Sequence, residues 1–118
     1  MITRKQLMFR RKWIRALRSG KYEQAYHALR RGTGFCCLGV ACDVSGLTEW
    51  KKRPDGYFFQ YFRAWTTLPP KVRTRLGLTL YDVRELASQN DSGFPETHTF
   101  LEIANTVELL TEADRRNS

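Results

Sequence analysis

The sequence contains no apolar run that approaches the roughly 18 residues of a membrane-spanning helix. No apolar segment follows the basic N-terminus, so we expect no signal peptide, no membrane partner and a cytoplasmic location. The phosphate-binding patterns Gly-x-x-x-x-Gly-Lys-Ser/Thr and Gly-x-Gly-x-x-Gly are both missing. Acidic residues are scattered, which gives no support to a paired-carboxylate active site. The 118 residues suffice for one compact domain, spanning residues 1–118.

Cysteine is scarce, and its pattern argues against two common kinds of site. Three cysteines, two of them adjacent, do not suit a disulfide framework. Cys36, Cys37 and Cys42 with His27 or His98 would supply four zinc-type ligands, but this spacing is not typical of zinc sites. We therefore expect three small, reduced thiols in the core, with no metal and no cofactor.

A cysteine nucleophile is the alternative interpretation of the same segment. Gly34-Phe35-Cys36-Cys37 leads into a helix, where nearby backbone amides would lower the pKa of a thiol. A base would be needed, and His27 or His98 would have to supply it. Nothing in the local sequence fixes that geometry, so we favour a binding protein and keep an enzyme as an alternative.

Basic residues are abundant and unevenly distributed. Residues 1–31 contain ten Lys or Arg and one acid, Glu23, a net charge of +9. Residues 32–118 contain ten Lys or Arg and eleven acids, a net charge of −1. This asymmetry indicates an anionic partner, which would be a nucleotide, a nucleic acid or an acidic protein. A solvated face that aids solubility is the alternative explanation.

The segment from residue 37 to residue 45 is apolar on nearly every side. Placed on a helix, only Gly39 and Asp43 share a polar strip. Such a helix belongs inside a domain. Gly34 precedes it and Gly46 suits its C-terminal cap. We expect the rest of the chain to pack around this central helix.

The remaining segments have weaker patterns. We expect helices over residues 4–18, 70–76 and 80–88 and a last helix that follows the Thr99 capping box, with residues 111–118 as a frayed tail. An extended arm over residues 21–31, an antiparallel hairpin that turns at Pro54-Asp55-Gly56 and a loop over residues 90–95 complete the chain. The expected fold class is α+β: a small single domain, mainly helical around a buried central helix.

Several of these pieces occur in a recognisable order. They are Trp13-x-x-Ala16-Leu17-Arg18-Ser19-Gly20-Lys21-Tyr22-x-Gln24, Phe35-Cys36-Cys37-Leu38-Gly39-Val40-x-Cys42-Asp43, Leu68-Pro69-Pro70-x-Val72, Leu86-Ala87-x-x-Asn90-Asp91 and Phe100-x-x-Ile103-Ala104. This order resembles a group of small uncharacterised bacteriophage and prophage proteins. The resemblance covers residues 13–108, and the Cys-Cys-Leu-Gly block is its most specific part. It implies a phage origin and a host bacterial cell as the location, but no activity. Residues 25–27 depart from the more glycine-rich stretch of such proteins.

We interpret the chain as a phage-encoded binder of a small anionic nucleotide, which by analogy with other phage proteins would sequester a bacterial immune signalling nucleotide. A DNA- or RNA-binding accessory protein is the first alternative, and an enzyme that cleaves a signalling nucleotide is the second. Basic side chains would contact phosphates, aromatic rings would stack on a base, and amides would read polar edges. The oligomeric state is left open. The candidate ligand-binding residues are Arg10, Lys21, Tyr22, Gln24, Arg30, Arg31, Asn90 and Asp91.

Overall fold

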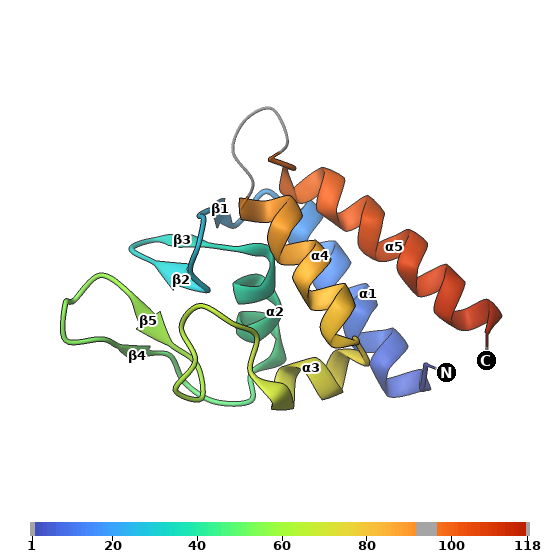
Figure 1. The fold of residues 1–118 in the computed structure, drawn as a ribbon, viewed down its shortest axis with the longest axis horizontal. Coiled ribbons are helices and arrows are strands. Elements are labelled where there is room, and N and C mark those ends of the chain that lie inside the picture. Colours follow the sequence, from blue (N-terminus) through green and yellow to red (C-terminus); the bar gives the residue numbers. More distant parts are fainter. Residues whose placement is uncertain (1, 92–96, 118) are drawn as a thin grey trace.

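The computed structural model describes residues 2–91 and 97–117, and within them it confirms the α+β fold class. The helices are α1 (Arg4–Arg18), α2 (Cys37–Ser45), α3 (Pro70–Leu76), α4 (Leu80–Asp91) and α5 (Phe100–Arg116). The strands are β1 (Glu23–Gln24), β2 (Arg30–Arg31), β3 (Gly34–Phe35), β4 (Lys51–Lys52) and β5 (Phe59–Gln60). Figure 1 shows α1, α3, α4 and α5 on one side of α2 and the strands on the other. Among the described residues, no helix has both the length and the hydropathy to cross a membrane.

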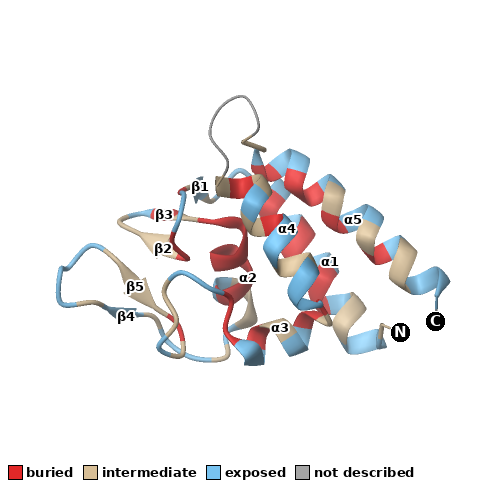
Figure 2. Cartoon of the chain, in the orientation of Figure 1, coloured by how far each residue is buried: buried red, intermediate tan, exposed pale blue. Residues whose placement is uncertain are grey.

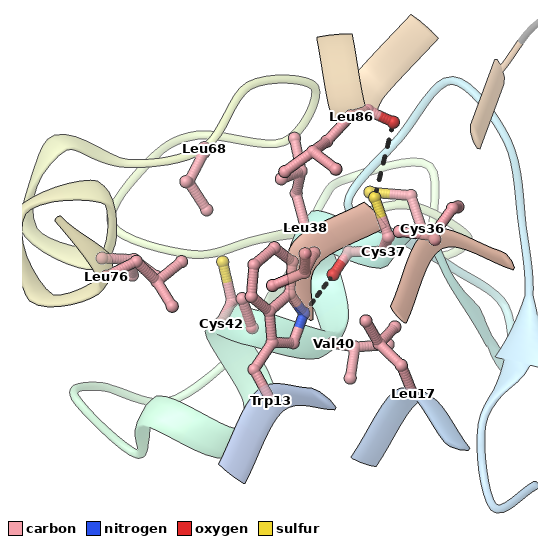
Figure 3. Packing of buried hydrophobic residues seen from close by; sticks show 14 of the residues in the cluster. Trp13, Leu17, Cys36, Cys37, Leu38, Val40, Cys42, Leu68, Leu76 and Leu86 are labelled. Carbon is pink, nitrogen blue, oxygen red and sulfur yellow. Dashed lines mark hydrogen bonds between the residues drawn. The ribbon is translucent and has the colours of Figure 1, made fainter. Parts of the chain in front are cut away.

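Helix α2 is the centre of the core, as its sequence predicts. Residues 37–42 are all buried (Figure 2). The thiol of Cys36 caps the first turn by accepting the Gly39 N–H at 3.3 Å. Gly46 ends the helix at a φ of 60°, the left-handed conformation that glycine adopts without strain. Figure 3 shows the indole of Trp13 against α2, where its Nε1 donates to the carbonyl oxygen of Cys37 at 2.9 Å.

Helix α1 packs on α2 and α5 through the apolar face expected from its sequence. Phe9, Trp13, Ile14 and Leu17 are buried on that face. Arg10 lies among them and is 0% exposed. Its guanidinium therefore does not extend into solvent.

Helices α4 and α5 both run further than their sequences predict. The pattern predicts that α4 ends at Ser88, but it continues to Asp91, so Asn90 and Asp91 are helical. The other residues of the expected loop lie outside the described ones. Helix α5 continues to Arg116 instead of fraying after residue 110. It does so because Thr111 is buried and Asp114 is bound to the Arg10 guanidinium.

Two small sheets lie side by side. Strand β3 pairs with β1 in parallel and with β2 antiparallel, and the turn at Gly32 and Thr33 joins β2 to β3. Strands β4 and β5 form the expected hairpin. An antiparallel bridge between Arg31 and Phe58 connects the two sheets. The tip of the hairpin is thereby held against the β2–β3 turn.

Candidate functional site

A groove of about 430 Å³ lies where the hairpin tip meets the three-stranded sheet. We call it the sheet–hairpin groove. Its volume falls within the range of small-molecule sites, roughly 300–1,000 Å³. The lining residues with charged, polar or aromatic side chains are Glu23, Gln24, Tyr26, Arg31, Thr33 and Tyr57.

The β2–β3 turn forms one wall of this groove, and its shape depends on glycine. Gly32 has a φ of 57° and donates its N–H to the carbonyl oxygen of Tyr57 at 2.8 Å. A Cβ atom at Gly32 would lie 2.9 Å from Cε1 of the Tyr57 ring. The Thr33 hydroxyl donates to a carboxylate oxygen of Glu23 at 2.8 Å, which ties the turn to β1. The wall is therefore held by hydrogen bonds at both edges.

Two tyrosine rings and one guanidinium give the groove its chemical character. Tyr26 is 39% exposed and Tyr57 is 48% exposed, which is high for large aromatic side chains. The guanidinium carbon of Arg31 lies 5.5 Å from the centroid of the Tyr57 ring. Arg31 also donates to the carbonyl oxygen of Tyr26 at 3.5 Å. Aromatic surface and positive charge are thus available to the same ligand.

Gln24, Asn90 and Asp91 come together, as the sequence-based site requires. The Gln24 amide donates to Oδ1 of Asn90 at 3.0 Å and to the carbonyl oxygen of His98 at 2.8 Å. Asn90 is 0% exposed and donates to Asp91 at 2.7 Å. It also accepts the N–H of Cys37 at 3.2 Å, which caps α2. Gln24 lines the groove, whereas the buried Asn90 does not line it and contacts it through its hydrogen bond with Gln24.

Asp91 extends this network toward His27. One carboxylate oxygen of Asp91 accepts the backbone N–H of His27 at 2.9 Å. His27 has a φ of 65°, an uncommon conformation for a residue other than glycine. Strained backbone of this kind costs free energy and is frequent beside functional sites. Here Asp91 stabilises the bend next to Tyr26.

Arg10 and Arg30 both contact other parts of the protein, and neither lines the sheet–hairpin groove. Arg10 is buried and donates to the carbonyl oxygens of Leu76 and Gly77 at 2.7 and 2.8 Å. The guanidinium carbon of Arg30 lies 4.0 Å from the ring centroid of Phe59 and also faces the rings of Phe35 and Trp50. Both arginines hold elements of the fold together. The sequence shows that both residues are charged, but it does not show that Arg10 contacts α3 and that Arg30 contacts the hairpin.

Tyr22 and Lys21 also lie apart from the sheet–hairpin groove. The Tyr22 hydroxyl donates to a carboxylate oxygen of Asp43 at 2.6 Å, and Nε1 of Trp50 donates to the other at 3.1 Å. Burial, followed by the bond to Asp43, raises the pKa of Tyr22 well above its usual range. Lys21 is exposed and does not line the groove. Tyr57, in contrast, lines the groove, although it was not among the candidate residues selected from the sequence.

The cysteines lie in the core, and the burial of Cys36 argues against the nucleophile hypothesis. Burial raises the pKa of the Cys36 thiol to about 12, although backbone N–H groups act in the opposite direction. Burial also raises the pKa of Cys37 and Cys42 well above the usual range. A thiol in this state is a poor nucleophile near neutral pH. In the described part of the chain, no group of three or more His, Cys, Asp or Glu could hold a metal ion.

The comparison with protein families assigns the chain to one family. No curated protein and no solved structure matches it significantly. One family model matches residues 5–111, a span that includes the sheet–hairpin groove and all five helices except the ends of α1 and α5. The chain therefore belongs to the family described as a domain of unknown function (DUF8296).

Proposed function

We propose that this protein binds a small anionic nucleotide in the sheet–hairpin groove. One observation carries the proposal: Tyr26, Tyr57, Arg31 and Gln24 line one groove, and the Arg31 guanidinium lies 5.5 Å from the centroid of the Tyr57 ring. A nucleotide is the ligand class that combines a flat aromatic base, polar base edges and phosphate. Each of these parts has a matching group in the groove.

The distribution of charge around the groove orients the ligand. Arg31 is its cation, and Glu23 is its carboxylate. The phosphate would contact Arg31, while Glu23 would accept hydrogen bonds from a ribose hydroxyl or an exocyclic amine. The base would stack on Tyr26 or Tyr57. We propose further that the chain is phage-encoded and sequesters a bacterial signalling nucleotide by holding it in this groove.

Calorimetric titration against a panel of nucleotides tests this proposal. The panel contains cyclic dinucleotides, ADP-ribose derivatives and random-sequence duplex DNA, each at low and high salt. We expect one small nucleotide to bind with a shallow salt dependence and to be recovered unchanged after the protein is denatured. Tyr26→Ala or Arg31→Ala should weaken binding about tenfold or more, since stacking on one base contributes about 1–3 kcal/mol.

Arg84→Ala is the matched control, because Arg84 is an exposed arginine on α4 outside the groove. It should leave the affinity unchanged, and a thermal melt of every variant without ligand shows whether it is folded. Binding of DNA alone would contradict the proposal if its affinity fell by about 0.9 log units per log unit of salt for each phosphate contacted. Recovery of a chemically altered nucleotide would instead support the alternative that the protein is an enzyme that cleaves a signalling nucleotide.

A further inference from the structure

A second groove lies at the C-terminal end of α2 and shares no residue with the sheet–hairpin groove. It consists of two adjoining hollows of about 460 and 390 Å³, between α1, the end of α2 and α3. Both hollows are lined by Lys5 and Arg75, so they lie next to each other. We call them together the α1–α3 groove. Gln6 joins its two sides by donating to the carbonyl oxygen of Thr74 at 3.1 Å.

The walls of the α1–α3 groove are strongly basic. They are formed by Lys5, Lys12, Arg15, Lys71 and Arg75. All five side chains are exposed, and no aspartate or glutamate lines either hollow. Within residues 2–91 and 97–117, none of the five forms an ion pair with a carboxylate. Their charge is therefore uncompensated and attracts an anionic partner.

The floor of the same groove is apolar. Met8 is 59% exposed, which is unusual for a large apolar side chain on a helix that packs into the core. Leu47 and Pro70 add apolar surface in one hollow, and Phe9 and Val44 add it in the other. The phosphate backbone of a nucleic acid makes polar contacts, so it would leave this apolar floor without a matching surface. A ligand that matches both the walls and the floor carries acidic groups beside an apolar surface.

We propose that the α1–α3 groove docks an acidic amphipathic helix of a partner protein. Such a helix would place its apolar stripe against Met8, Leu47 and Pro70, and its acidic residues against the basic walls. Lys5 and Lys12 are seven residues apart on α1, which corresponds to about 10.5 Å along the helix axis. Acidic residues seven positions apart on the bound helix would therefore face both lysines. This interaction is independent of the proposed nucleotide site.

Selection from a displayed library of random 18-residue peptides tests the inference on the whole protein. We expect the enriched peptides to carry apolar residues at positions i, i+3 or i+4 and i+7, flanked by Asp and Glu. One enriched peptide, labelled with fluorescein, then serves as the probe in anisotropy titrations. A Lys5→Glu, Lys12→Glu, Arg75→Glu variant should bind this probe at least about tenfold more weakly, because each reversed charge removes an attraction and adds a repulsion.

The matched control is Arg4→Glu, Arg11→Glu, Arg84→Glu, which changes the net charge equally at exposed positions outside the groove. It should bind the probe as the unaltered protein does. Met8→Ser should weaken peptide binding at constant charge, which separates docking on the apolar floor from simple attraction. The inference is overturned if no acidic amphipathic peptide is enriched, or if the two charge variants weaken binding equally. It is also overturned if duplex DNA binds in the groove and Met8→Ser has no effect.

Discussion

At the scale of single residues, Gly39 shows how closely the backbone of α2 approaches its neighbours. A Cβ atom at Gly39 would overlap the carbonyl oxygen of Leu29. That oxygen also accepts the N–H of Cys36 at 3.1 Å, so it is held in place at the start of α2. Backbone cannot move aside as the end of a flexible side chain can. Gly39 is thus required by packing, and its φ is not in the left-handed region.

We therefore expect Gly39→Ala to lower the free energy of unfolding by about 3 kcal/mol or more, at the upper end of overpacking effects. Urea denaturation followed by tryptophan fluorescence measures this change. Gly46→Ala is the control: its Cβ would meet nothing within 4 Å, and its φ of 60° alone should cost about 1–2 kcal/mol. Equal losses in the two variants would show that the contact with Leu29 does not limit packing.

Single residues also show which parts of the candidate site could be identified from the sequence. Gln24, Asn90 and Asp91 were selected as polar side chains in two separate segments, and they do form one network. Arg10 and Arg30 were selected for their charge, which says nothing about burial. Their positions depend on α3, α5 and the hairpin, which lie far away in the sequence. Local sequence identifies the chemistry of a side chain, but its partners depend on the packing of distant elements.

At the scale of elements, α2 and its N-cap residue Cys36 place three thiols in the core in the neutral form. The ordinary pKa of a cysteine thiol is 9.0, and burial raises that of Cys36 to about 12. In the unfolded chain the thiols ionise near their ordinary pKa. Between these two values the folded state therefore binds more protons than the unfolded state, and stability falls as the pH rises.

We expect the free energy of unfolding to decrease between about pH 9 and about pH 12, with each buried thiol contributing at most about 1.4 kcal/mol per pH unit. Urea titrations at a series of pH values measure this decrease. Tyrosine and lysine also titrate in that window, so the comparison is with Cys42→Ala, which removes one thiol and leaves the others. The variant should lose stability less steeply. If the free energy of unfolding fell with pH equally steeply in both proteins, the Cys42 thiol would not contribute to the pH dependence.

At the scale of the whole molecule, Arg10 connects three helices that are distant in the sequence. From α1, its guanidinium donates to the carbonyl oxygens of Leu76 and Gly77 at the C-terminal end of α3, where carbonyl groups have no partner within the helix. It also binds Asp114 on α5 at 2.7 Å. Asp114 is 32% exposed on its side-chain surface, whereas Arg10 is 0% exposed. The carboxylate can therefore reach water, but the arginine depends on its protein partners.

We expect Arg10→Ala to lower the free energy of unfolding by about 3–5 kcal/mol, because it leaves a cavity and removes the donors from buried carbonyl groups. Arg11→Ala, at the neighbouring exposed position, should change it by less than about 0.5 kcal/mol. Thermal and urea denaturation of both variants test this difference. A stable Arg10→Ala protein would show that water replaces the guanidinium at the end of α3.

The sequence by itself determined the helices, the hairpin and the centre of this protein, but not the bends that divide the expected arm over residues 21–31 into β1 and β2. Apolar periodicity, glycine and proline breakers and the Thr99 capping box act over one or two turns, so they predict α1, α2, α3, the start of α5 and the hairpin without tertiary information. Only the tertiary structure decided where α4 and α5 end. The last turns of these helices are stabilised by Asn90 contacts to β1 and α2 and by the bond between Asp114 and Arg10.

The two grooves were also decided only by tertiary structure. Each is formed by elements that are separated in the sequence, the β2–β3 turn with the hairpin tip and α1 with α3. The sequence located the excess of positive charge in residues 1–31, but helix packing divided it. Arg10 went into the core and Arg30 between aromatic rings, while Lys5, Lys12 and Arg15 stayed exposed on α1. Composition fixes how much charge a chain carries, and burial against distant elements fixes which of those charges a partner can reach.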